Sequence, residues 1–142
     1  MIRQTIALLL VGLAFALCAA RAEEVILSSL IDVEAGEEVQ WVVEANDFER
    51  EPAWDGISPL PISIETVVQK ARDALVQSHP KQEIIFRSVA IRPPVKNAEK
   101  WPSRFAFVVE FDLGKGGQRL STVVSMTGRI VEPKRQPLLE TK

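Results

Sequence analysis

The segment Ile64–Ser78 constrains the fold most, because it is the stretch of the chain with the clearest helical periodicity. Ser63 precedes it as a good N-cap, and Glu65 places a negative charge in its first turn, near the positive end of the helix. Pro80 ends the helix, since a proline disfavours helical geometry in the residue before it. The apolar face is wide and consists of small and β-branched residues, which suits packing on a sheet. Its members are Ile64, Val67, Val68, Ala71, Ala74 and Leu75, with Ser78 at the end.

Three segments after this helix have the patterns of strands. Glu83–Arg92 ("EIIFRSVAIR") is the first, and it stops at a pair of prolines. Arg104–Leu113 ("RFAFVVEFDL") alternates, with four apolar residues and Leu113 on one face and Ala, Val, Glu and Asp on the other, which predicts a half-buried antiparallel strand. Gln118–Met126 is the third, and Ile130–Val131 indicates a short last strand.

The segments before the helix give weaker signals. Val39–Glu44 is β-rich and follows a turn, so we expect a strand there, and Val25–Leu30 is a second, less marked strand. Three prolines and a glycine make Glu49–Pro61 a loop. The C-terminal residues from Pro133 have few anchors, which predicts a frayed tail.

The first 22 residues have the three parts of a secretory signal peptide. Arg3 supplies the positive start, residues 6–20 form the apolar run, and residues 20–22 (Ala-Arg-Ala) form a small-x-small cleavage signal. The alternative is an uncleaved anchor, but the run is about 15 residues long and a spanning helix needs roughly 20. Lipid attachment at Cys18 is disfavoured by Leu17 before it. We expect a secreted or periplasmic protein with no membrane span after cleavage.

The expected fold is therefore α+β, with a single helix packed on one face of a curved antiparallel sheet of about four strands, in the order β-α-β-β-β. The expected organisation is a signal peptide over residues 1–22, a single domain over residues 23–132 and a flexible tail over residues 133–142. The 120 residues that follow the signal are enough for one modest core.

Composition excludes several classes of function. The chain has 17 basic and 19 acidic residues, and the signal carries two arginines and no acid, which leaves 15 and 19 and a formal charge of −4. A mildly acidic domain carries no electrostatic footprint for nucleic acid. The only cysteine lies in the signal, so no disulfide framework is expected. His79 is the only histidine, which argues against a metal site and a catalytic triad, and no cofactor is expected.

Two glycine-containing loops are better explained by folding than by chemistry. Gly114–Gly117 lies between two strands, whereas a phosphate-binding loop joins a strand to a helix, so a hairpin is expected. Thr127 and Gly128 form a turn in which glycine accepts a positive φ at low cost.

Four acids cluster in the loop region before the helix, and they also favour a structural explanation. A calcium site is conceivable there, but the spacing fits no EF-hand and Arg50 lies among the acids. A solvated loop is expected. The four acids are Asp47, Glu49, Glu51 and Asp55.

The three tryptophans give the strongest hint of a binding surface. Trp41 lies in a strand, whereas Trp54 and Trp101 lie in loops near prolines. Tryptophan is enriched at binding hot spots, but it also caps the edges of small cores. Any partner-binding surface is expected at Trp54, Trp101 and Arg104.

The segment from Ile62 to Val131 resembles the PepSY family of secreted and periplasmic domains. The resemblance rests on the helix "SIETVVQKARDAL", the strands "FAFVVEFDL" and "RLSTVVSM", and the closing "TGRIV". The family pattern often has an Asp shortly before the turn, whereas Val123–Met126 contains no acid here. The element order is also similar to that of cystatin-like folds. The resemblance implies a non-enzymatic domain associated with inhibition or regulation of secreted peptidases.

The expected function is a secreted, non-enzymatic binding or regulatory domain that modulates a peptidase or another envelope protein. One alternative is a small-ligand carrier or enzyme with a pocket between helix and sheet. A second alternative is a subunit of an envelope assembly, which would use the tail or an unpaired sheet edge as its contact.

Overall fold

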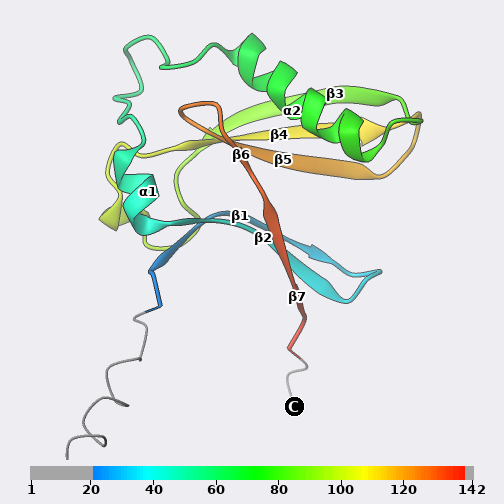
Figure 1. Cartoon of the computed structure of the whole chain (residues 1–142), viewed down its shortest axis with the longest axis horizontal. Helices are drawn as coiled ribbons and strands as arrows, with labels where there is room; N and C mark the ends of the chain where they lie inside the picture. The colour runs from blue at the N-terminus through cyan, green and yellow to red at the C-terminus, as the bar shows by residue number, and fades with distance from the viewer. Residues whose placement is uncertain (1–20, 140–142) are drawn as a thin grey trace, which may run out of the picture.

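The computed structural model describes residues 21–139 (Figure 1). The predicted signal peptide, residues 1–22, therefore falls almost entirely outside the described residues. None of the helices within them is long and apolar enough to cross a membrane.

The described residues form three layers, with a helix above two stacked antiparallel sheets (Figure 1). Helix α2 covers one face of a four-stranded sheet of order β3-β4-β5-β6, and a three-stranded sheet of order β1-β2-β7 lies against the other face. A short helix, α1, follows β2 at one side. The elements are β1 Glu24–Asp32, β2 Glu37–Glu44, α1 Ala45–Arg50, α2 Ile64–Ser78, β3 Ile84–Arg92, a 3-10 helix at Ala98–Lys100, β4 Ala106–Leu113, β5 Arg119–Ser125, β6 Ile130–Val131 and β7 Pro133–Pro137.

Helix α2 has both of its predicted ends. The Ser63 hydroxyl accepts a hydrogen bond from the Thr66 backbone N–H at 3.2 Å, which satisfies one free donor of the first turn. His79 is the C-cap, directly before Pro80. Val67 and Ala71 are completely buried against the four-stranded sheet. Local capping and periodicity therefore predict this element, and its packing on the sheet stabilises it.

The α+β class is confirmed, but the prediction of a single helix on one sheet is wrong, because the described residues contain two α-helices and two sheets. The hairpin β1–β2 does not join the sheet under α2. It pairs instead with β7, from Trp41 opposite Pro133 to Glu37 opposite Pro137. The predicted frayed tail is therefore a strand over its first five residues. Its backbone supplies the pairing, and ion pairs from Lys134 and Arg135 to acids of β1 and β2 add to it.

Strand β4 supplies both of the core clusters that hold the layers together. Phe107, Val109 and Phe111 are fully buried under α2. Ala106 and Val108 point the other way and are buried against the three-stranded sheet. The second face of β4 was expected to be solvated, and this is wrong for its first half because a second sheet covers it. The cluster between the sheets is Val25, Leu27, Val39, Trp41, Phe48, Trp101, Ala106, Val108, Val123 and Val131.

Candidate functional site

The two sheets are packed together along only half of β4. Ala106 and Val108 are buried between the sheets, but the next two residues on the same face are Glu110 and Asp112, which are only partly buried. Carboxylates are not buried unless they are paired, so the sheets have to separate beyond Val108. Figure 1 shows the strands of the two sheets diverging toward the β1–β2 hairpin.

A cleft of about 290 Å³ lies where the sheets separate. One wall is the inner face of the three-stranded sheet, with Leu30, Val39 and Trp41 as its apolar part. The other wall is the start of β5, over Arg119–Thr122, and the last turn of α2 forms the roof. A second hollow of about 320 Å³ continues on the other side of Leu30, Arg119 and Ser121. We call the first hollow the inter-sheet cleft.

The start of β5 is a free strand edge inside the inter-sheet cleft. β5 pairs with β4 along its whole length, but it pairs with β6 only at Val123 and Val124. The Ser125 N–H donates to Arg129 O at 2.9 Å, so Ser125 points its backbone groups toward the β6 side. Successive residues of a strand point these groups to opposite sides. The N–H and C=O groups of Ser121 and Arg119 therefore also point to the β6 side, where β6 no longer runs.

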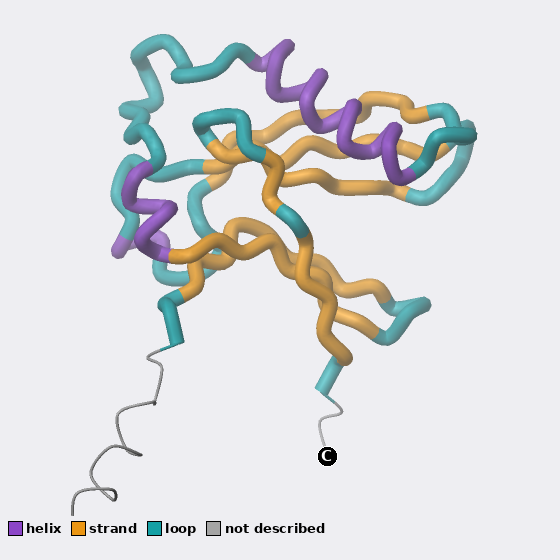
Figure 2. The backbone as a smooth tube through the Cα atoms, in the orientation of Figure 1, coloured by secondary structure: helices purple, strands orange, loops and turns teal. Residues whose placement is uncertain are grey.

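The edge is free because the chain changes sheets at Glu132. β6 ends at Val131, which is buried between the sheets, and β7 begins at Pro133 as a partner of Trp41 in the other sheet. Figure 2 shows this break as a short loop segment between the two strands. We call Glu132 the crossover. It ends the pairing of β5 after two residues and bounds one end of the free edge.

The other sheet edges carry features that oppose pairing. The Leu138 N–H donates to Gly36 O, directly before β2. By alternation, the backbone groups of Pro133, Arg135 and Pro137 point away from β2, toward the free side of β7. Two of these three outward positions have no N–H to donate. β1 is bulged near Ile26 and is covered there by the N–H of the loop residue Val95, and β3 is bulged near its middle. Natural sheets use such devices against unwanted association, and the β5 edge has only its position inside the cleft.

The charges of the inter-sheet cleft are partly neutralised within its walls. The Arg135 guanidinium lies 3.8 Å from the Asp32 carboxylate and 3.4 Å from that of Glu37, so it is held against the wall formed by the three-stranded sheet. Among residues 21–139, Arg119 and Glu132 have no ion-pair partner. His79 reaches the roof, where its Nδ1 lies 3.2 Å from Leu75 O. One unpaired cation and one unpaired anion therefore mark opposite ends of the free edge.

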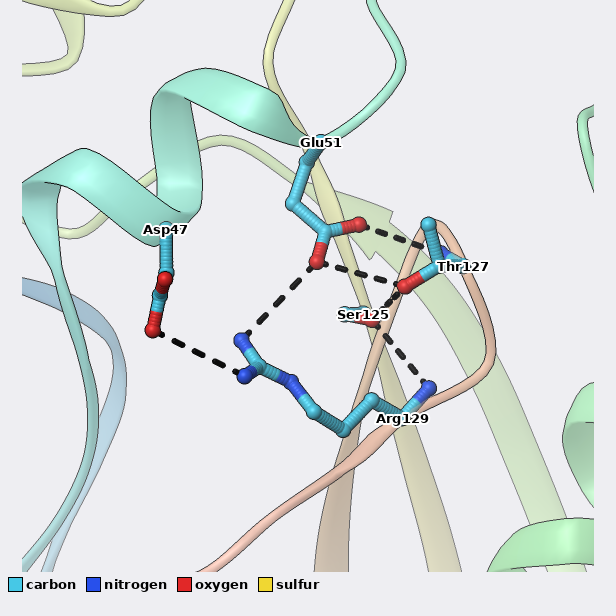
Figure 3. Close-up of polar contacts among 5 residues, drawn as sticks. All are labelled: Asp47, Glu51, Ser125, Thr127 and Arg129. Carbon is cyan, nitrogen blue, oxygen red and sulfur yellow. Dashed lines mark hydrogen bonds and ion pairs between the residues drawn. The ribbon is translucent and has the colours of Figure 1, made fainter.

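A buried carboxylate fixes the turn that joins β5 to β6 (Figure 3). Glu51, only 7% exposed, accepts hydrogen bonds from the Thr127 N–H at 3.1 Å and the Thr127 hydroxyl at 3.3 Å. The Arg129 guanidinium lies 3.9 Å from Glu51 and 3.8 Å from Asp47. The Ser125 hydroxyl accepts from the Arg129 N–H at 3.2 Å. The carboxylate therefore ties the segment after α1 to the turn between β5 and β6, and so helps to set where β6 begins.

This cluster corrects the expectation that the loop acids are all solvated. Glu51 is buried and hydrogen-bonded, whereas Glu49 is exposed. Asp55 holds its own turn, because the Ser58 hydroxyl and the N–H groups of Ser58 and Ile57 all donate to it. The Ser58 hydroxyl, followed by these two N–H groups, lowers the pKa of Asp55 to about 2. Over residues 21–139 there is no group of three or more metal-ligating side chains.

The three residues predicted as a partner-binding surface lie away from the inter-sheet cleft. Trp101 is buried and packs edge-on against Phe48 with ring centres 5.5 Å apart. Trp54 is half-buried in the other core cluster, edge-on to Phe105 at 5.8 Å, and its Nε1 donates to Ser58 O. Arg104 is half-buried and its N–H donates to Trp101 O. The two tryptophans thus pack into clusters on opposite faces of the four-stranded sheet, as core caps would.

The residues of the free edge were missed in the sequence, although one signal was present. Ser121 and Arg119 look like ordinary strand residues, because an edge depends on where the neighbouring strand stops. The change from Ala106 and Val108 to Glu110 and Asp112 along one strand face indicates that a covering layer ends there.

The chain matches none of the protein-family models, curated proteins or solved structures with which it was compared. The PepSY resemblance therefore stays a prediction. The family pattern often has an Asp shortly before the closing turn, and this chain departs from it, since the carboxylate that bonds the turn comes from the distant Glu51.

Proposed function

We propose that this protein is a secreted or periplasmic, non-enzymatic binding domain that holds an extended segment of a partner protein in the inter-sheet cleft. The segment adds to the four-stranded sheet as a strand beside Arg119–Thr122. This mode of recognition takes its affinity from backbone hydrogen bonds and its specificity from alternate side chains. Modulation of a peptidase or another envelope protein would follow from the identity of the partner.

The free edge of β5 inside the inter-sheet cleft is the observation that carries the proposal. A strand edge presents a row of unpaired N–H and C=O groups and is therefore a ready template for another strand. Leu30 and Trp41 offer apolar contacts to one face of a bound strand, and Leu75 of α2 lies at the other. A short segment can thus be held on its edge and on both faces.

A selection experiment tests this proposal directly. Random-peptide binders are selected on the purified protein and their affinities are compared on Ser121→Pro and Ser121→Ala variants. Ser121 faces Glu110 in the β4 register but points its N–H away from β4, so proline there removes no ladder bond. Proline deletes the donor that a bound strand needs, and we expect roughly tenfold weaker binding, which is about 1.4 kcal/mol. Alanine keeps the donor and should change affinity less than about twofold.

Circular dichroism and thermal unfolding establish that both variants are folded. Binders that bind the proline variant as tightly as the wild type would overturn strand addition at this edge. Amide exchange gives a second measure, because the Ser121 N–H should exchange freely without peptide and become protected with it.

The apolar wall of the inter-sheet cleft favours a second candidate function, that of a carrier of small apolar ligands. Val39 and Trp41 line a hollow of about 290 Å³, close to the lower limit for small-molecule pockets. The hollow lies between the two sheets and under the last turn of α2, whose Ala74, Leu75 and Ser78 line it. A Trp41 fluorescence change with fatty acids or other apolar compounds, unaffected by Ser121→Pro, would favour this candidate.

A further inference from the structure

The free edge of β5 is open at one end and closed at the other. At the closed end, Val131 is still paired with Val123, and the crossover carries the chain from one sheet to the other. A strand that lies beside Ser121 therefore meets β6 head-on and has no straight path past it. At the other end, beyond Arg119, the edge opens toward the hairpin loop Gly114–Gly117. The shape of the edge therefore favours a chain end over the middle of a chain.

The direction of pairing selects which chain end this is. β5 pairs antiparallel with β4 and with β6, and antiparallel pairing is slightly more stable per residue than parallel pairing. A bound strand that is antiparallel to β5 runs in the same direction as β6. It starts near the crossover and runs toward Arg119. Its amino terminus then lies at the closed end.

The charge at the closed end agrees with this direction. Glu132 is exposed and lines the inter-sheet cleft, and no cation of residues 21–139 lies within ion-pair distance of it. A free amino terminus at the closed end is a cation near this carboxylate. The opposite direction would place a carboxylate terminus next to Glu132, which would be repulsive. Charge and pairing direction thus point to the same end of the chain.

We infer that the ligand of the inter-sheet cleft is the free amino-terminal segment of a partner protein, such as the new end made by removal of a leader or by proteolytic cleavage. Its first residues continue β6 along β5, with the amino group near Glu132. This inference rests on the proposed function and narrows it from any extended segment to one class.

Three display formats of the same random heptapeptide library separate this inference from the proposed function. The segment is shown at a free amino terminus, at a free carboxyl terminus, or inside a constrained loop. Binders are counted only if Ser121→Pro weakens their binding about tenfold or more. We expect such binders from the amino-terminal format alone. Equal yields from the loop format would overturn the inference and leave strand addition intact. An absence of Ser121-dependent binders in every format would overturn the proposed function itself.

The role of Glu132 is tested on one selected peptide with and without an N-terminal acetyl group. Exposed ion pairs contribute up to about 1 kcal/mol, so acetylation should weaken binding to the wild type by about two- to fivefold. In the Glu132→Gln variant, acetylation should make no difference. Glu99→Gln is the matched control, because Glu99 is also exposed and lies outside the cleft. Equal affinity of both peptides for the wild type would show that the amino group does not lie near Glu132.

Discussion

Replacing Glu51 with alanine should destabilise the protein far more than an ordinary loop substitution. The buried carboxylate accepts two hydrogen bonds from Thr127, and one of the donors is a backbone N–H that has no other acceptor among the described hydrogen bonds. Hydrogen bonds to charged groups contribute about 1.5–3 kcal/mol each, and part of this is offset by the cost of burying the carboxylate. We expect a loss of about 2–3 kcal/mol. For a domain of this size, that lowers Tm by roughly 10 °C.

The Asp47→Ala variant is the matched control for this measurement. Asp47 contacts the same Arg129 side chain, at 3.8 Å, but both groups are about half exposed. Such surface pairs contribute at most about 1 kcal/mol. Urea unfolding followed by tryptophan fluorescence gives both free energies. The reasoning would be refuted if Glu51→Ala cost less than about 1 kcal/mol, or if Asp47→Ala cost as much. Glu51→Gln, which keeps one acceptor oxygen, should fall between the two.

Three further predictions follow from local geometry. Gly128→Ala should cost about 2 kcal/mol or more in urea unfolding, because Gly128 has φ +86° and a Cβ there would lie 2.6 Å from an isoleucine side chain. An NMR titration should place the pKa of Asp55 at about 2, and Ser58→Ala should raise it. Because that pKa is lowered by folding, the turn is stabilised above pH about 4, the usual value, and loses this contribution as the pH falls through about 2. A Pro133→Thr, Pro137→Thr variant should self-associate more than the wild type in light scattering, and an unchanged mass would show that these prolines do not protect the edge of β7.

Sequence reasoning was correct wherever the signal was local. The cap, the apolar stripe and the terminating proline of Ile64–Ser78 lie within one segment, and they define α2 with both of its ends. The alternation in Arg104–Leu113 likewise predicts β4, because one face of the strand packs against that helix. Such elements need no knowledge of distant partners.

The second sheet was missed because its pairing is distant in sequence. Trp41 lies opposite Pro133, more than 90 residues later along the chain. The β7 segment "PKRQP" has no apolar residue, so hydrophobic periodicity cannot reveal it. It is held by backbone pairing with β2 and by ion pairs, and neither leaves a pattern within the segment itself. The tail was therefore predicted to be frayed for a sound local reason that tertiary pairing overrides.

The candidate site follows from the same distant pairing. If the chain continued along β5 after Val131, that edge would be filled, and β1 and β2 would remain an isolated hairpin. A two-stranded hairpin is only marginally stable, whereas a sheet of three strands with a hydrophobic face can be stable. The crossover at Glu132 gives β7 to that hairpin and leaves Arg119–Thr122 without a partner strand on the β6 side. The open edge is tolerated because the end of α2 and the three-stranded sheet flank it, which opposes flat contact with another sheet. The stability of the second sheet and the free edge of β5 therefore have one structural cause.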